Sequence, residues 1–241
     1  MAVEELGESG ASIALIPGSS KGLSSFPNQL ALADREYRLL APAARTEVPA
    51  RIDFEEDAGH LHISLAPDPV HLVGHSYGGL TAIHLAALRP TTVLSLLLVE
   101  PAAMSVARGI PEVEHHIEQV GAVFERADEM SVEEFAACFV EALGSAWDGK
   151  RELAGQERLR FELLRRQRLP WTANLPLDEL RRAAYPKLIV TSGSDPIYEA
   201  IADRLSSAIA AERKIVPGSG HRVQDAPAFN DLLRQIATPA R

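Results

Sequence analysis

The stretch PVHLVGHSYGGLTAIHLAAL, from Pro69 to Leu88, decides how this chain must fold. An apolar run ends at Val73, three glycines surround a single serine, Ser76, and a second apolar run follows. A short apolar run bounded by turn residues is typical of a buried strand, and the longer run after it has the length of a helix. The stretch therefore predicts a sharp turn from strand to helix with Ser76 at its tip.

Short apolar runs alternate with helical patterns on both sides of this turn. The predicted strands cover residues 12–16, 37–41, 70–73, 93–99, 187–193 and 212–218. The predicted helices cover residues 26–34, 53–66, 80–88, 196–210 and 226–237. Continuous apolar strands alternating with helices predict an α/β fold, with a mostly parallel, doubly wound sheet covered on both faces.

This alternation stops between residues 102 and 184, where the pattern is helical, for example over residues 132–147 and 157–169. The simplest organisation is a core of residues 1–101 and 185–241, interrupted by a helical cap, or lid, of residues 102–184. A chain of 241 residues with 46% hydrophobic content is long enough for one large core and short for two.

Charge and composition narrow the classes of partner. The net charge of −9 gives no basic footprint for a nucleic acid, and the single cysteine, Cys138, excludes a disulfide within the chain. The N-terminus has no basic segment before an apolar run, and no run approaches the roughly 20 apolar residues that span a membrane. We expect a soluble cytoplasmic protein with a small-molecule substrate and no nucleic-acid or membrane partner; its oligomeric state is left open.

The residues around Ser76 match G-x-S-x-G, from Gly74 to Gly78. Such a turn lifts a nucleophilic serine clear of the sheet, and small neighbours let the strand and helix approach closely. The helix N-terminus favours negative charge, so the N–H of Tyr77 is a candidate oxyanion donor. A glycine-rich turn with an incidental capping serine is the alternative, but the position between strand and helix favours the nucleophile.

With these motifs the chain resembles the α/β-hydrolase fold family, in its branch of serine hydrolases with a helical cap. The likeness spans nearly the whole chain and rests on HLVGHSYGG, the PGSS turn after the first predicted strand, SLLLVEPAA, and GSD followed by GSGH. The resemblance implies a cap inserted after the sixth strand and a catalytic triad. The first predicted strand would be the family's third, so the sheet is expected to start short.

A serine hydroxyl needs a base, and His221 is the best of eight histidines. It lies in VPGSGHRV, on a loop after a predicted strand, as the family's base does; a surface-loop histidine is the alternative. His75 is expected to pack under the turn. His115 and His116 are adjacent, so their side chains diverge on a helix, and we expect neither a metal ion nor a cofactor.

Two acids compete for the third position of the triad, which orients the imidazole. Asp195 gives the chain order Ser76, Asp195, His221 that the fold favours, although Asp195-Pro196 also reads as a helix cap. Glu100 follows the strand after the elbow, where some members of the family take their acid. We prefer Asp195 and keep Glu100 as the alternative.

The second oxyanion donor is expected in the loop Pro17-Gly18-Ser19-Ser20, with Ser19 ahead of Ser20. The family often has a histidine before the glycine, and here that histidine is replaced. Lids on this fold exclude water and shape the substrate pocket. Six arginines between residues 151 and 168 could attract an anionic substrate, but the glutamates among them favour a solvated helix face.

These residues together predict a serine hydrolase that cleaves an ester, thioester or lactone of a small apolar substrate through an acyl-enzyme. Three alternatives stay open, because a fold does not fix a function. They are a non-hydrolytic enzyme resembling a hydroxynitrile lyase or a cofactor-free oxygenase, a hydrolase of carbon–carbon bonds, and a ligand receptor with slow turnover.

Overall fold

In a computed structural model the chain forms one sheet of seven strands, in the order β1-β3-β2-β4-β5-β6-β7. The structure describes residues 1–18, 22–33, 35–65, 67–147 and 152–237. Only β1 runs antiparallel, against β3. The strands are β1 (Val3–Leu6), β2 (Ala11–Ile16), β3 (Tyr37–Pro42), β4 (Val70–His75), β5 (Val93–Val99), β6 (Lys187–Thr191) and β7 (Glu212–Ile215). The predicted α/β class with a mostly parallel sheet is therefore confirmed.

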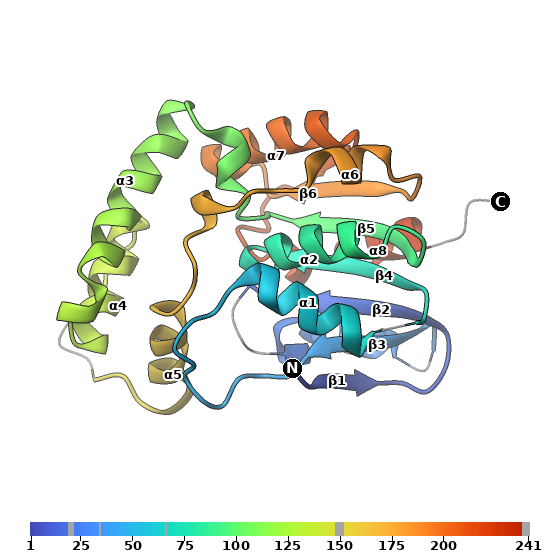
Figure 1. Cartoon of the computed structure of the whole chain (residues 1–241), viewed down its shortest axis with the longest axis horizontal. Helices are drawn as coiled ribbons and strands as arrows, with labels where there is room; N and C mark the ends of the chain where they lie inside the picture. The colour runs from blue at the N-terminus through green and yellow to red at the C-terminus, as the bar shows by residue number, and fades with distance from the viewer. Residues whose placement is uncertain (19–21, 34, 66, 148–151, 238–241) are drawn as a thin grey trace.

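Helices cover both faces of the sheet, and the strands alternate between two cores accordingly. In β2, Ala14 and Ile16 join one hydrophobic cluster, whereas Ile13 and Leu15 join the other. The first cluster also contains residues of α1 (Phe54–Ser64), α2 (Tyr77–Leu88) and α7 (Pro196–Ile209). The second contains residues of α8 (Phe229–Ala237), which lies behind the sheet in Figure 1. Burial on both faces explains why the central strands are continuously apolar.

Residues 102–184, which we call the cap segment, contain helices and, among its described residues, no strand of the sheet. Its helices are α3 (Pro111–Glu125), α4 (Val132–Ala142), α5 (Gly155–Leu164) and α6 (Leu177–Arg182). Figure 1 shows α3, α4 and α5 together at one end of the sheet, and they share a hydrophobic cluster centred on Phe135. By contrast, Leu180 of α6 joins the core cluster. The boundaries at residues 102 and 184 stay a prediction.

Two elements differ from the sequence-based expectation. The N-terminal strand β1 was not predicted, because VEEL carries two glutamates and forms a partly exposed edge that pairs Val3 with Pro42 and Leu6 with Leu39. The sheet therefore has one strand before the first predicted one. Where a helix was predicted at residues 26–34, the described residues form a 3₁₀ helix over Pro27–Leu32, which follows another 3₁₀ helix over Gly22–Ser25. The proline at residue 27 suits a helix start, which shortens any helix begun earlier.

Candidate active site

Ser76 lies at the tip of the turn from β4 to α2, with the unusual backbone angles φ 54° and ψ −122°. A non-glycine residue with positive φ is strained and needs surrounding structure to hold it. The backbone supplies that support. The Ser76 N–H donates to the carbonyl of Val99 at 3.0 Å, and the Ser76 carbonyl accepts from Gly79 at 2.9 Å and from Ala102 at 3.0 Å. The turn is thus fixed between β5 and the first turn of α2.

Close approach of three backbone segments explains the glycines around Ser76. A Cβ atom on Gly78 would lie 2.4 Å from the carbonyl oxygen of Ile16, and one on Gly18 would lie 2.8 Å from Cβ of Ser76. The loop after β2 therefore passes directly against the serine. Ser19 and Ser20, the predicted donors in this loop, lie outside the described residues.

Tyr77 begins α2, so its backbone N–H is one of the amides that lack an intrahelical partner. Its side chain is buried and points away from this role, because the phenol donates to the carbonyl of Ile52 at 3.4 Å. Burial raises the pKa of Tyr77, so the phenol stays neutral. The side chain anchors the helix start while the main chain is left for an oxyanion.

His221 follows β7 on a loop, and its ring contacts a carboxylate. Nδ1 of His221 lies 2.7 Å from Oε2 of Glu100, whose side chain is completely buried at the end of β5. Glu100 itself has a positive φ of 38°, and its N–H donates to the carbonyl of Val190 in β6. A carboxylate at Nδ1 fixes the imidazole so that Nε2 can accept a proton.

A second set of donors keeps Glu100 ionised. Its other oxygen, Oε1, accepts from the N–H of Ser192 at 2.8 Å and from the Ser192 hydroxyl at 2.7 Å. Burial by itself raises the pKa of this carboxyl. The hydrogen bonds from His221 and Ser192 outweigh burial and hold the pKa of Glu100 below its usual value. The buried acid can therefore remain charged opposite the imidazole.

The expectation that Asp195 contacts the imidazole is wrong. The carboxylate of Asp195 caps α7, where it accepts from the N–H of Ile197 at 2.9 Å, and Pro196 occupies the first helical position. The physical reason is local: a helix N-terminus offers free N–H groups two residues away, and Asp195 satisfies one of them. The structure brings Glu100, the alternative acid, to His221 instead.

His75 lies under the turn as a second, structural imidazole. Its Nε2 lies 3.0 Å from the carbonyl oxygen of His221, and the two rings are 4.9 Å apart. Because a carbonyl only accepts, Nε2 of His75 carries a proton and donates it. Burial lowers the pKa of His75 to about 3, so this ring stays neutral and holds the loop that carries His221.

Two further side chains at the site were not singled out from sequence. Ser192 supports Glu100 as described, and Tyr198 packs its ring against His221, with ring centroids 4.7 Å apart. A sequence signal for Tyr198 was available. It is an aromatic residue in the first turn of a helix that follows a strand, and that turn borders the carboxyl edge of the sheet.

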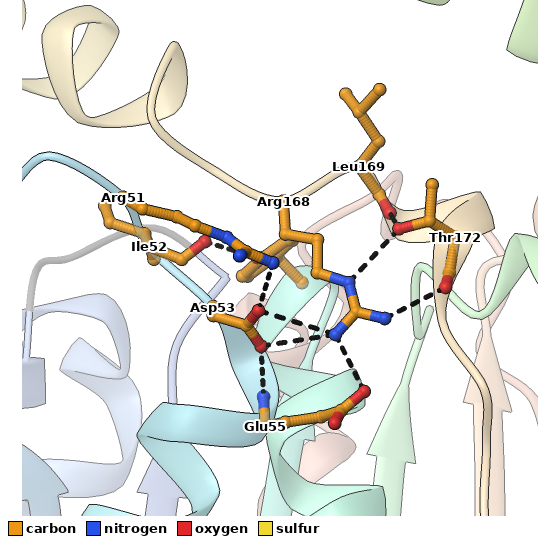
Figure 2. A network of polar contacts seen from close by, with 8 residues as sticks. Arg51, Ile52, Asp53, Glu55, Arg168, Leu169 and Thr172 are labelled. Atoms are coloured by element: carbon orange, nitrogen blue, oxygen red, sulfur yellow. Dashed lines mark hydrogen bonds and ion pairs between the residues drawn. The ribbon is translucent and has the colours of Figure 1, made fainter.

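The end of the cap segment is tied to the core beside Tyr77. Ile52 and Gln167 form an isolated parallel bridge, and Arg168 contacts both Asp53 and Glu55, the latter at 2.7 Å (Figure 2). The Arg168 guanidinium also donates to the carbonyl and hydroxyl oxygens of Thr172. The same Ile52 carbonyl that accepts from Tyr77 accepts from the N–H of Arg168 at 2.8 Å.

The arginine run of the cap segment serves mostly internal contacts. Arg165 donates to the carbonyl of Ala127, and Arg158 forms ion pairs with Glu133 and Glu162. Arg166 lies 3.3 Å from Asp128. These pairings favour the solvated helix face over an anionic-substrate site. Arg151 lies outside the described residues.

The described ranges contain neither a metal-ligand cluster nor a helix that could span a membrane. No cluster of three or more histidine, cysteine, aspartate or glutamate side chains there could hold a metal ion. None of the helices in those ranges is long and apolar enough to cross a membrane.

Comparison with known proteins shows the family to which the chain belongs. The model of the Alpha/beta hydrolase family matches residues 13–230. The chain belongs to the α/β hydrolase family. A curated member, Lipase LipV of Mycobacterium tuberculosis, is 49% identical over 45 residues, which is 19% of this chain. That match spans only 17% of the lipase, so the lipase activity is not transferred by it.

Solved structures support the fold of this α/β hydrolase along its full length. It is similar to MenH from S. aureus, with a TM-score of 0.70 and 18% identity over 97% of each chain. It is also similar to the carboxylesterase from Nitrososphaera gargenis, with a TM-score of 0.67 and 17% identity over 97% of this chain and 92% of that one. It is similar to the enol-lactonase from Burkholderia xenovorans as well, with a TM-score of 0.62 and 20% identity over 98% of this chain and 95% of that one.

Proposed function

We propose that this α/β hydrolase is a serine hydrolase that cleaves an ester, thioester or lactone of a small apolar substrate through an acyl-enzyme. The observation that carries the proposal is the buried Glu100 held 2.7 Å from Nδ1 of His221, together with the strained turn that carries Ser76. Carboxylate, imidazole and serine in this order are the parts that acyl transfer needs.

Each residue takes one role. Ser76 attacks the carbonyl, and His221 accepts the serine proton at Nε2 and passes it to the leaving group. Glu100 takes the place assigned to Asp195, because it orients the imidazole and stabilises its positive charge. The backbone N–H of Tyr77 and that of Ser19 hold the oxyanion. His221 then activates water, which releases the acyl group.

A small cavity supports a short acyl group. It measures about 40 Å³ and is lined mainly by apolar groups, among them Ile16, Ile52 and Leu61, together with Gly18 and Tyr77 that flank the serine. The cap segment contributes Gln167 to this cavity, and its role in the proposed reaction is to exclude water. Neutral substrates fit, because the charged side chains of the lining, Arg45 and Asp57, already pair with one another at 2.5 Å.

The test combines covalent labelling with turnover. A fluorophosphonate probe should label the wild-type protein at Ser76, and p-nitrophenyl acetate should be hydrolysed faster than p-nitrophenyl octanoate. Ser76→Ala should abolish labelling and reduce turnover to a few per cent or less. It removes few atoms outside the core, so the unfolding free energy should change by about 1 kcal/mol or less.

The outcomes separate the alternatives. Substantial turnover in a clean preparation of Ser76→Ala would exclude Ser76 as the nucleophile. Labelling of the wild type without hydrolysis of any acyl ester would favour a receptor or a non-hydrolytic enzyme. Preference for the longer ester would contradict the short acyl pocket while leaving the serine mechanism intact.

A further inference from the structure

The cavity proposed for the acyl group contains two neutral polar side chains that bond to no other described residue. They are the hydroxyl of Thr81 and the carboxamide of Gln167. The remaining polar side chains of the described lining have partners: Arg45 pairs with Asp57 at 2.5 Å, and the Tyr77 phenol donates to a backbone carbonyl. A polar group without a partner in a largely apolar wall is a candidate contact for a bound molecule.

Thr81 lies in the interior of α2 and is only 3% exposed. A hydroxyl that is buried and unpaired costs free energy unless something binds it. The Thr81 oxygen keeps some accessible surface, unlike that of Thr191, which is sealed without a partner. Because the rest of the residue is covered, this open surface faces the cavity that Thr81 lines.

Gln167 belongs to the cap segment, and the backbone around it sets the direction of its side chain. It pairs with Ile52 in a parallel bridge, in which the Ile52 N–H donates to Arg166 at 2.7 Å and the Arg168 N–H donates to Ile52 at 2.8 Å. Successive side chains of an extended segment point to opposite sides. Arg168 points toward Asp53 (Figure 2), so Gln167 points to the other side, where it lines the cavity with its partner Ile52.

Arg168 holds this arrangement from the side away from the cavity. Its guanidinium lies 2.7 Å from the carboxylate of Glu55 and 3.4 Å from that of Asp53, and 4.6 Å from the centroid of the Phe54 ring. The Asp53 side chain is almost completely buried, so salt screens this ion pair little. The backbone beside Gln167 is fixed before a substrate arrives, which reduces the entropy lost when the carboxamide binds one.

We propose that Thr81 and Gln167 determine the substrate by forming hydrogen bonds with one hydroxyl on an otherwise apolar acyl group. A threonine hydroxyl and a carboxamide can each donate and accept. A single substrate hydroxyl can therefore donate to one of them and accept from the other. The proposal rests on the proposed function and narrows it to esters, thioesters or lactones of short hydroxy acids.

The geometry of α2 indicates where on the acyl chain this hydroxyl lies. Thr81 comes four residues after Tyr77, so the two share a face of the helix and lie about 6 Å apart along its axis. In the proposed mechanism the N–H of Tyr77 holds the acyl carbonyl. A hydroxyl on the third carbon lies about 3 Å from the carbonyl carbon, and a hydrogen bond adds about 3 Å. We therefore expect a 3-hydroxyacyl group.

The test compares two esters of equal size, p-nitrophenyl 3-hydroxybutanoate and p-nitrophenyl 3-methylbutanoate, which differ only by a hydroxyl in place of a methyl group. Each kcat/KM is divided by the uncatalysed hydrolysis rate of the same ester, which removes differences in intrinsic reactivity. Wild type should prefer the hydroxy ester about tenfold, the size of two neutral hydrogen bonds. Gln167→Met and Thr81→Val keep the side-chain size and remove the polar group, so each should lower the preference to about threefold or less.

Two control variants keep the test specific. Thr81→Ser retains the hydroxyl and should retain the preference. Tyr185→Phe removes another buried hydroxyl that bonds to α2, at the carbonyl of Ala86 and outside the cavity lining, and should leave the preference unchanged. Because the preference is a ratio measured on one preparation, a variant that folds only in part still reports it.

Equal use of the two esters by the wild type would overturn the proposal. A preference that persists in both Gln167→Met and Thr81→Val would also overturn it, because another group would then bind the hydroxyl. Failure of the proposed function looks different. The wild type would then hydrolyse neither ester, and the fluorophosphonate probe would not label Ser76.

Discussion

Glu100 and Asp195 follow two neighbouring parallel strands, β5 and β6, and their surroundings differ in one decisive way. Asp195 is followed directly by α7, and its carboxylate is taken by the N–H of Ile197. Two residues after Glu100, the N–H of Ala102 already donates to the carbonyl of Ser76, so the carboxylate of Glu100 is free to cross to the loops after β6 and β7. A carboxylate can contact a distant imidazole when no nearby backbone N–H binds it.

Backbone geometry sharpens this contrast. Asp195 has an extended conformation, with φ −112° and ψ 113°, as helix caps usually do. Glu100 has a positive φ of 38°, and its N–H is bonded to Val190 in the adjacent strand. Glu100, the strained residue, is completely buried and contacts His221. Backbone strain of this kind is commonly found at active sites.

The largest expected difference lies in catalysis. Glu100→Gln should lower kcat by about a thousandfold or more, because an amide can favour the wrong imidazole tautomer and cannot stabilise the imidazolium. Asp195→Asn should lower kcat by less than about threefold, since asparagine also caps helices well. Steady-state kinetics on one ester substrate compares the two variants directly. A larger loss in Asp195→Asn would restore Asp195 as the acid.

A smaller effect on kcat is expected for Ser192, which contacts Glu100. Ser192→Ala removes the hydroxyl that donates to Oε1 of Glu100 but keeps the backbone N–H. We expect kcat to fall about tenfold, the size of one hydrogen bond to a charged group. Ser206→Ala, which removes a hydroxyl on the exposed part of α7, is the control and should leave kcat unchanged.

Ser192→Ala also tests how the stability of the protein depends on pH. The folded-state pKa of Glu100 is lowered, so its stabilising contribution is complete above the unfolded pKa of about 4.3 and is lost as the pH falls through the folded value. Ser192→Ala removes part of that lowering. The difference in unfolding free energy between wild type and variant should therefore be present at pH 7 and shrink on acidification, as denaturant titrations can measure. A difference that stays constant would show that Ser192 does not act through the charge of Glu100.

The smallest effect is expected in the stability of α7. Asp195→Ala removes the cap and should lower the unfolding free energy by about 1 kcal/mol, whereas Asp195→Asn should be nearly neutral. Guanidinium titration of the two variants gives the comparison. Equal stability of Asp195→Ala and wild type would mean that the cap does not hold Asp195 in place, and the contrast with Glu100 would lose its basis.

Local sequence rules predicted the turn at Ser76 because its causes are local. A Cβ atom on Gly74 would meet Ala82, Gly78 and Gly79 within the same stretch, and strand and helix periodicity flank the turn. The mostly parallel sheet followed from apolar runs that are buried on both faces. His75 was expected to pack under the turn; it is buried, and its ring lies beside that of His221.

The choice of acid could not be predicted in the same way. It depends on a contact between Glu100 and His221, which are 121 residues apart, and on a positive φ that no local motif announces. Asp195 obeyed a strong local rule, helix capping, and that rule took precedence over its position in the chain order. Likewise β1 was hidden, because an edge strand with two glutamates lacks the apolar pattern of the central strands.

The bridge between Ile52 and Gln167 gives the cap segment a fixed pivot next to Tyr77. Any rocking of α4 that keeps this bridge moves like a lever, with its largest travel at the far end and almost none beside Ser76. Such a motion would leave the backbone around Tyr77 in place. In a chimaera that exchanges caps between relatives, residues 166–168 and 51–53 form a single joint, which must be transplanted together or left together.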